Sequence, residues 1–400
     1  MSSLAFLARG RVFVRDESGA TRALESPFAH TLQQQREDTH RQRALHRRSS
    51  AMGLPPQLQE QMEKDGPPPM NIRASGVCLG EAGRLLFALS ADKIGGYLSF
   101  DLAQNKEQRL MHSAEFGLEH LDRDASTGLV ACTVVGGDGT RAIGVMPEAG
   151  RHPDILTEGD ALVMAPRWVR GQSKTLVFQS AGVARDGDGF LRERAPFEIE
   201  RLNVETGALE TLAKDAKHDF LGPLQDAGGA LYAIRRPFSP RGAKASRTFL
   251  ALLLDIALFL PRFGLALIGW ANFFSWRYRG QGLSSQTAQG SDNRATGERA
   301  APVQIRAWGE VLTPQIARGL GRKTESQEEA TWVSKEWQLV KRAPGSEEWH
   351  VLAEGVLSFD VAPDGTVFFC DGGRLFRLKP DGGREKLCAE AGIESVRVLS

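Results

Sequence analysis

The feature that most constrains the fold of this 400-residue chain is a recurring unit of four short apolar segments. The units are roughly 45 residues long, and turns rich in Gly and Asp separate the segments. Short strands in this density are typical of a sandwich, a barrel or a propeller, and a four-strand period favours propeller blades. The sequence therefore predicts an all-β protein.

Four units can be delimited in the sequence. The clearest covers residues 164–214, with strands at 165–168, 174–180, 197–202 and 208–213, and the others cover 72–112, 118–157 and 356–388. Residues 393–399 have the pattern of an inner strand without followers, whereas the N-terminus supplies three strands without an inner one. We therefore expect residues 1–400 to form a single propeller of about six blades, closed by both termini.

Two segments carry a family resemblance. Residues 359–368 are similar to a Trp-Ser-Pro-Asp-Gly-Lys segment followed by an apolar strand, and residues 168–178 are a partial copy. In that copy Val169-Arg170-Gly171-Gln172 replaces the usual Ser-Pro-Asp-Gly. On these residues the chain resembles the TolB-like and WD40-like β-propellers. The resemblance implies a fold and no particular activity, because propellers carry many functions.

Two insertions interrupt the predicted blades. Residues 27–70 lie between blades and are expected to form a polar helix to about Arg48, followed by a Pro-rich linker. Residues 237–335 split a blade, since the strands at 230–235 and 336–341 fit one unit. Within the second insertion we expect apolar helices at 247–276, a flexible linker at 280–302 and a short helix at 304–320.

The apolar segment of the second insertion is the predicted functional element. As one helix, its roughly 28 residues would extend ~40 Å, enough to cross a bilayer. Pro261 should divide it into two helices, and Asp255 would cost ~3 kcal/mol at the bilayer centre. The predicted membrane or partner contacts are Phe249, Leu250, Leu253, Ile256, Phe259, Leu267, Trp270, Phe273, Phe274 and Trp276. The flanking basic residues suited to anionic lipid are Arg241, Lys244, Arg247, Arg277 and Arg279.

Three arrangements of this apolar segment are open. It could form a helix pair that lies in or re-enters the membrane interface, a helical hairpin buried against protein, or a single span. A single span would place two strands of one blade on opposite sides of the bilayer, so that their hydrogen bonds could not form. The sequence favours the interfacial pair over the buried hairpin, and the buried hairpin over the span.

Motifs for other function classes are missing from the sequence. The formal net charge is +1, the eight His form no H-E-x-x-H, and there is neither a P-loop nor a G-x-S-x-G elbow. Nucleic-acid binding is not expected, because no aromatic residues interleave the basic ones at 31–48. We predict no catalytic, cofactor-binding or metal-ligating residue. An enzyme of the propeller lactonase or dehydrogenase type would need a channel lined with acidic and His residues.

The expected location follows from the N-terminus and the cysteines. Residues 1–17 lack the pattern of a secretory signal, and Cys78, Cys132, Cys370 and Cys388 are widely spaced, as expected for reduced thiols. The sequence thus predicts a cytoplasmic, non-enzymatic scaffold that binds an unidentified protein partner and docks to the cytosolic face of a membrane. The alternative is a soluble module whose apolar helices form a homo- or hetero-oligomer interface.

Overall fold

The computed structural model describes residues 3–50, 72–91, 94–137, 139–159, 161–185, 191–239, 304–312, 332–379 and 381–399. The chain divides into two units, one formed by Met1–Phe238 with Pro302–Ser400 and the other by Ser239–Ala301. Every helix and strand named below belongs to the first unit.

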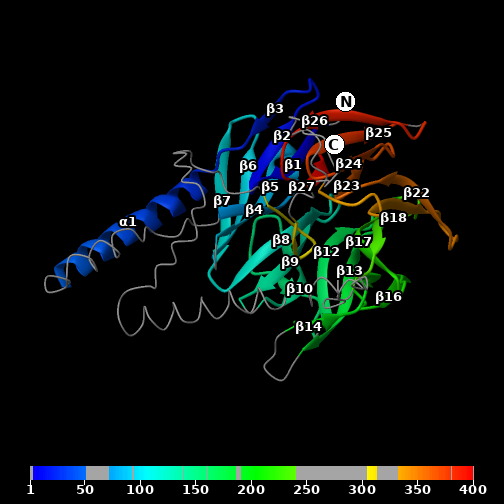
Figure 1. The fold of residues 1–400 in the computed structure, drawn as a ribbon, viewed down its shortest axis with the longest axis horizontal. Coiled ribbons are helices and arrows are strands. Elements are labelled where there is room, and N and C mark those ends of the chain that lie inside the picture. The colour runs from blue at the N-terminus through cyan, green and yellow to red at the C-terminus, as the bar shows by residue number, and fades with distance from the viewer. Residues whose placement is uncertain are drawn as a thin grey trace, which may run out of the picture. The chain divides into compact units, whose positions relative to one another are not determined.

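The first unit is a six-bladed β-propeller, and each blade is built on four antiparallel strands (Figure 1). From inner to outer strand, the first two blades are β27 (Ile393–Val398), β1 (Leu4–Ala8), β2 (Arg11–Arg15) and β3 (Thr21–Ala23), then β4 (Ile72–Leu79), β5 (Leu85–Ala91), β6 (Ile94–Asp101) and β7 (Lys106–Ser113). The third is β8 (Phe116–Arg123), β9 (Leu129–Gly136), β10 (Arg141–Pro147) and β11 (Asp154–Ile155).

The remaining three blades continue the same pattern around the ring. The fourth is β12 (Ala161–Trp168), β13 (Thr175–Arg185), β15 (Glu198–Asn203) and β16 (Leu209–Ala213), with β14 (Leu191–Arg194) paired to the end of β13. The fifth is β17 (His218–Gln225), β18 (Leu231–Pro237), β21 (Gln338–Arg342) and β22 (Trp349–Glu354). The sixth is β23 (Ser358–Val361), β24 (Val367–Cys370), β25 (Arg374–Leu378) and β26 (Arg384–Ala389).

The first blade joins the two ends of the chain. β27 pairs antiparallel with β1, with Leu4 opposite Val398 and Phe6 opposite Val396. The inner strands β27, β4, β8, β12, β17 and β23 contact one another in this order, and β23 returns to β27. Because the C-terminal strand completes a sheet begun at the N-terminus, main-chain hydrogen bonds close the ring, as the sequence indicates.

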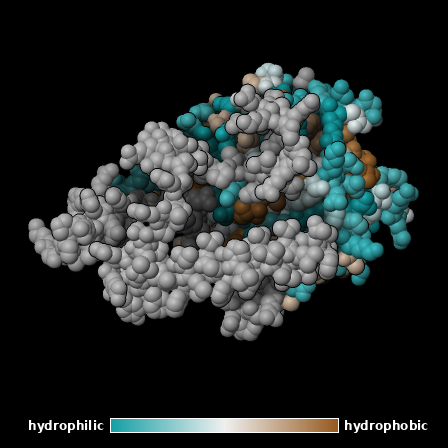
Figure 2. Space-filling model, viewed as in Figure 1, coloured by the Kyte–Doolittle hydropathy of each residue, from teal (hydrophilic) through white to brown (hydrophobic). Residues whose placement is uncertain are grey.

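Burial explains which strands are continuously apolar. β1 and β24 are buried at every position, because each lies inside a sheet that is covered on both faces by neighbouring blades. The outer strands β7, β16 and β26 expose many side chains, and Figure 2 shows mainly hydrophilic residues over the outer strands on this side. The four cysteines are free thiols, of which Cys388 alone is partly exposed.

The helix α1 (Pro27–Ser50) follows the first blade and is fixed by its first turn. Proline is favoured at the first helical position, and the Ser26 hydroxyl caps the helix by accepting the Ala29 N–H at 3.2 Å. The Phe28 N–H donates to the Glu107 carboxylate at 2.9 Å, and the Phe28 ring packs against the apolar cluster between the first two blades. The Pro-rich linker predicted up to residue 70 lies outside the described residues from residue 51 onward.

The predicted short helix at 304–320 is wrong where the structure describes it. β19 (Ile305–Ala307) and β20 (Glu310–Leu312) form a two-stranded hairpin. Its two turn residues, Trp308 and Gly309, have φ of 55° and 77°. Positive φ at both positions is the type I′ geometry that connects twisted strands tightly, and it is incompatible with an α-helix. Residues 313–320 lie outside the described part of the chain.

The second insertion begins and ends on the fifth blade. β18 pairs with β21, with Ala233 opposite Val340, so the strands before and after the insertion are neighbours in one sheet. The apolar segment at 247–276, the linker at 280–302 and all the predicted contact and flanking basic residues lie outside the described residues. Among the helices that the structure describes, none has the length and hydropathy needed to span a membrane.

Candidate functional site

The candidate site is a pocket at the centre of the ring, where residues from all six blades converge. It encloses about 190 Å³ and is lined by residues of the inner strands β27, β4, β8, β12, β17 and β23, together with Leu7, Arg141 and the hairpin β19–β20. These inner strands surround the central channel of the propeller. The pocket is therefore a part of that channel that the hairpin helps to enclose.

β-bulges shape the wall of the pocket. Five blades show a register shift along the inner strand, at Ala74/Gly76, Glu119/Asp122, Met164/Arg167, Leu221/Leu224 and, on the β27–β1 pair, Leu7/Ala8. A bulge bends its strand and redirects a side chain. The residues that lack a pairing partner inside these shifts and line the pocket are Ser75, His120, Ala165, Gly222 and Glu394.

Buried polar side chains of the second strands stabilise three of the bulges. Thr133 on β9 accepts the Ala165 N–H through its hydroxyl at 3.1 Å and lies 3.2 Å from the Nδ1 atom of His120. Gln179 on β13 accepts the Gly222 N–H at 2.7 Å. Neither Thr133 nor Gln179 is exposed. The irregular backbone is thus held by hydrogen bonds of the blades themselves.

Trp308 at the tip of the hairpin is fixed by three contacts in the channel. Its ring stacks on His120, with centroids 5.8 Å apart and planes 5° from parallel. Its Nε1–H donates to the carbonyl of Leu357 at 3.0 Å. At Gly222 a Cβ atom would lie 2.7 Å from the Trp308 ring, so glycine is required there by the close approach.

Glu310 anchors the other end of the hairpin turn. Its carboxylate accepts two hydrogen bonds from Arg236, at 3.0 and 2.8 Å, and the Nε of Arg236 donates to Asp219 at 3.0 Å. Arg194 donates to both Asp219 oxygens, at 2.7 and 2.9 Å. Burial of Asp219 opposes its ionisation, but the hydrogen bond from Arg194 and the charge of Arg236 hold the pKa of Asp219 below its usual range. We call Arg194, Asp219, Arg236 and Glu310 the anchor cluster.

Five arginines line the pocket, and three of them are paired with carboxylates. Arg73 binds Glu394 at 2.8 Å, Arg141 binds Glu119 at 3.4 Å, and Arg167 lies 3.0 Å from both Asp122 and Asp360. The other two are Arg306 on β19 and Arg397 on β27. The Arg306 backbone N–H donates to Glu394, and the charges of Asp360 and Asp122 attract Arg397, but neither guanidinium group has a side-chain hydrogen bond or a close ion pair with a described residue. We call Arg306 and Arg397 the unpaired arginines.

Burial changes the protonation of two groups at the pocket. Loss of hydration, with a contribution from the nearby charge of Arg167, lowers the pKa of Arg397 to about 10, so that Arg397 still carries its charge at neutral pH. Burial lowers the pKa of His120 to about 4, although Glu119 favours the protonated form. His120 is therefore neutral at physiological pH, and it acts as a stacking surface for Trp308. The described residues contain no group of three or more His, Cys, Asp and Glu arranged to hold a metal ion.

The channel residues were not among the predicted site residues, which all lie outside the described part of the chain. One sequence signal could have indicated them. Pro166 and Pro223 stand inside inner strands directly after Ala165 and Gly222. Proline inside a central strand is confined to bulges, so each proline marks a point where the strand leaves its regular pairing.

The comparisons with known proteins agree on the fold. TolB from Acinetobacter baumannii is 12% identical, with a TM-score of 0.50 over 99% of this chain and 65% of that one. The fold is therefore that of a TolB-like propeller. This chain thus spans slightly less than two thirds of that TolB. A chain of a nidogen/laminin complex is 8% identical, with a TM-score of 0.51 over 100% of this chain and 99% of that one.

Similarity at these identities extends to the fold alone. A tricorn protease structure is also similar, at 12% identity and a TM-score of 0.45 over 100% of this chain and 34% of that chain. No protein-family model matches the sequence, and no curated protein matches it. The function of this TolB-like chain therefore has to be argued from its own residues.

Proposed function

We propose that this TolB-like chain is a non-enzymatic propeller scaffold that binds protein partners on its outer surface. The observation that supports this most is the hairpin in the channel. Trp308 and Glu310 are fixed by contacts to several blades, and the pocket beside them encloses only about 190 Å³. A polypeptide substrate does not fit in that volume. We therefore expect a protein partner to bind the outer surface of the propeller, which we call the rim and which includes the outer strands of the blades.

We further propose, from the sequence of the second insertion, that the scaffold docks to the cytosolic face of a membrane. Because β18 and β21 are paired, the insertion leaves and re-enters the propeller at one blade. Both ends then lie on the same side of any bilayer, which suits an interfacial helix pair better than a single span. The basic residues beside the apolar segment would attract anionic headgroups at about 1 kcal/mol each.

Liposome co-flotation tests the membrane part of the proposal. The full-length chain would be floated with vesicles of anionic phospholipid beside a variant in which residues 246–277 are replaced by a short Gly/Ser linker. A full-length variant with Leu253→Glu and Ile256→Glu is the finer probe, and a variant with residues 281–300 shortened is the control. We expect the full-length chain and the control to float, and the other two to stay in the aqueous fraction.

The same samples separate docking from oligomer formation. If no sample floats and the full-length chain alone self-associates in sedimentation experiments, the apolar helices form a protein interface and the docking proposal is wrong. The scaffold proposal itself is tested with a photo-crosslinking residue placed in cells at Leu209 or Val351, which are 62% and 45% exposed on outer strands. A discrete crosslinked protein is expected from at least one position, and an absence of crosslinks at both contradicts binding at this part of the rim.

A further inference from the structure

The charges around the channel pocket do not balance. Arg73 and Glu394 form one neutral pair, and Arg141 and Glu119 form another. The two carboxylates beside Arg167 are matched by Arg167 itself and by Arg170, which lies 3.6 Å from Asp360. These four arginines and four carboxylates balance one another. The unpaired arginines, Arg306 and Arg397, then leave an excess of two positive charges around the pocket.

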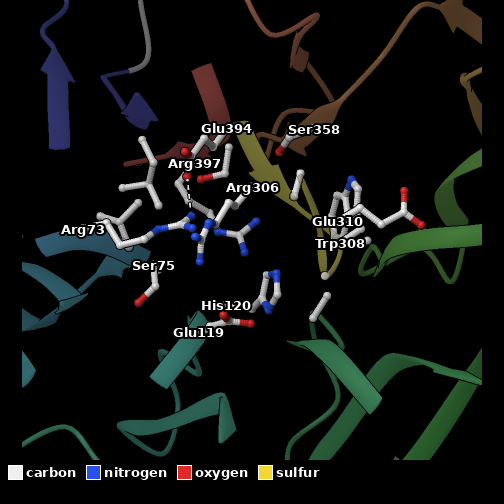
Figure 3. A pocket seen from close by; sticks show the side chains of 18 of the residues that line it. Arg73, Ser75, Glu119, His120, Arg306, Trp308, Glu310, Ser358, Glu394 and Arg397 are labelled. Atoms are coloured by element: carbon white, nitrogen blue, oxygen red, sulfur yellow. Dashed lines mark hydrogen bonds and ion pairs between the residues drawn. The ribbon is translucent and has the colours of Figure 1, made fainter. Parts of the chain in front are cut away.

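The unpaired arginines are directed into one small space. Figure 3 shows the side chains of Arg73, Arg306 and Arg397 pointing toward the same part of the pocket, with Glu394 on one side and His120 on the other. Arg306 is exposed on the hairpin, whereas Arg397 comes from the inner strand β27. Solvent can therefore reach the pocket at Arg306, and Arg397 lies among the protein groups of the channel wall.

An arrangement of this kind is unfavourable without a counterion. Two guanidinium groups that face the same pocket repel each other, and removal of hydration from Arg397 adds a penalty that ordinary surface arginines avoid. Attraction by Asp360 and Asp122 offsets this penalty only in part, because the pKa of Arg397 remains lowered. A guanidinium offers a planar fork of N–H donors that matches the oxygens of a phosphate or carboxylate. An anion between Arg306 and Arg397 would supply the missing acceptors and the missing charge together.

We propose that the channel pocket binds a small ligand through a phosphate group held between Arg306 and Arg397. A phosphate carries close to two negative charges on one tetrahedral centre, which matches two adjacent unpaired guanidinium groups. A dicarboxylate of the same charge separates its two groups along a carbon chain. The volume of about 190 Å³ admits inorganic phosphate or a phosphate ester with few carbon atoms.

Isothermal titration calorimetry of the full-length protein at low ionic strength tests this proposal. Sodium phosphate, glycerol phosphate and succinate would be titrated separately into phosphate-free buffer. We expect phosphate or glycerol phosphate to bind, and Arg306→Gln and Arg397→Gln to weaken that binding roughly ten- to a hundredfold, because each loses a charge-assisted hydrogen-bond fork. Arg84→Gln, an equal charge change at an exposed site outside the pocket, should bind as the unmodified protein does.

The relative affinities identify the source of the phosphate group. Tighter binding of glycerol phosphate indicates a small phosphate ester, and equal or tighter binding of inorganic phosphate indicates the free ion. The proposal is wrong if neither binds at millimolar concentration, if succinate binds as tightly, or if Arg306→Gln binds like the unmodified protein. Arg306 is exposed, so its variant should fold even if Arg397→Gln does not, and the Arg306 result then decides.

Discussion

The anchor cluster and the unpaired arginines each include one residue of the hairpin, Glu310 and Arg306, but they differ in charge balance. In the anchor cluster, Arg194 and Arg236 are matched by Asp219 and Glu310 through hydrogen bonds of 2.7 to 3.0 Å. Arg306, only four residues before Glu310, has no such partner within the described residues, and neither has Arg397. One hairpin therefore contributes a residue to a cluster of fully paired charges and a residue to a pair of arginines that lack side-chain partners.

This difference separates a structural role from a binding role. A buried charge whose partners are all in place contributes to stability chiefly because removal of one partner leaves the others uncompensated. A charge without a partner destabilises the folded chain slightly and is available to a ligand. We therefore expect substitutions in the anchor cluster to affect unfolding, and substitutions of the unpaired arginines to affect binding.

Asp219→Ala should give the largest loss of stability. Asp219 is 1% exposed and holds both Arg194 and Arg236, so its removal leaves two buried guanidinium groups without their shared carboxylate. We expect the free energy of unfolding to fall by about 3–5 kcal/mol, measured by urea denaturation. The control is Asp154→Ala, which removes an exposed pair with Arg151 and should change the value by less than about 1 kcal/mol. Equal effects in the two variants would contradict the structural role of the anchor cluster.

Trp308→Ala should release the tip of the hairpin from the channel. The variant loses the stack on His120 and the hydrogen bond to Leu357, and we expect a loss of about 2–4 kcal/mol in urea denaturation. Trp308→Phe keeps a ring over His120 and should lose about half as much. Val311→Ala alters the same hairpin at a side chain that is 53% exposed, and it should be nearly neutral. A neutral Trp308→Ala would show that the anchor cluster alone holds the hairpin.

The stability of the protein should depend on pH through His120. Its pKa is about 4 in the folded chain against a usual 6.5, so the unfolded chain binds a proton first as the pH falls. Stability is therefore full above about pH 6.5 and declines as the pH falls toward 4. Because His120 is partly exposed, we expect a loss of only about 1–2 kcal/mol between pH 7 and pH 5, measured by urea denaturation. His120→Phe keeps the stack on Trp308 and should remove most of this pH dependence. If the variant loses as much stability between pH 7 and pH 5 as the unmodified protein, groups other than His120 cause the pH dependence.

Much of the fold could be predicted from the sequence because it depends on local patterns. Strands buried on both faces, such as β1 and β24, are continuous apolar runs, and the turns between strands are marked by Gly and Asp. The closing blade follows from an inner strand at one end of the chain and three unpartnered strands at the other. These features need no knowledge of which blade lies beside which.

The channel site could not be predicted in this way, because its residues are brought together only by the closed ring. Arg73, Arg306 and Arg397 are single charges in separate segments, and no spacing between them repeats. The helix predicted at 304–320 is wrong for the described residues, because polar and apolar residues there do not alternate clearly enough to indicate the strands of the hairpin. The sequence Trp308-Gly309, with Gly in the second turn position, was the available signal for its type I′ turn.

Arg306→Gln should have the smallest effect on stability, and it tests the comparison most directly. Since Arg306 is exposed and its guanidinium has no close ion pair with a described residue, its replacement removes only a screened attraction to Glu394 and one of the excess positive charges of the pocket, and it leaves the backbone hydrogen bond to Glu394 in place. We expect the free energy of unfolding to change by no more than about 0.5 kcal/mol, with any gain largest at low salt and lost at high salt through screening. Arg236→Gln, on β18 and inside the anchor cluster that binds the hairpin, is the matched control and should be strongly destabilising. Urea denaturation of both variants at two salt concentrations measures the contrast, and a large loss in Arg306→Gln would mean that Arg306 is a structural residue rather than one held available for a ligand.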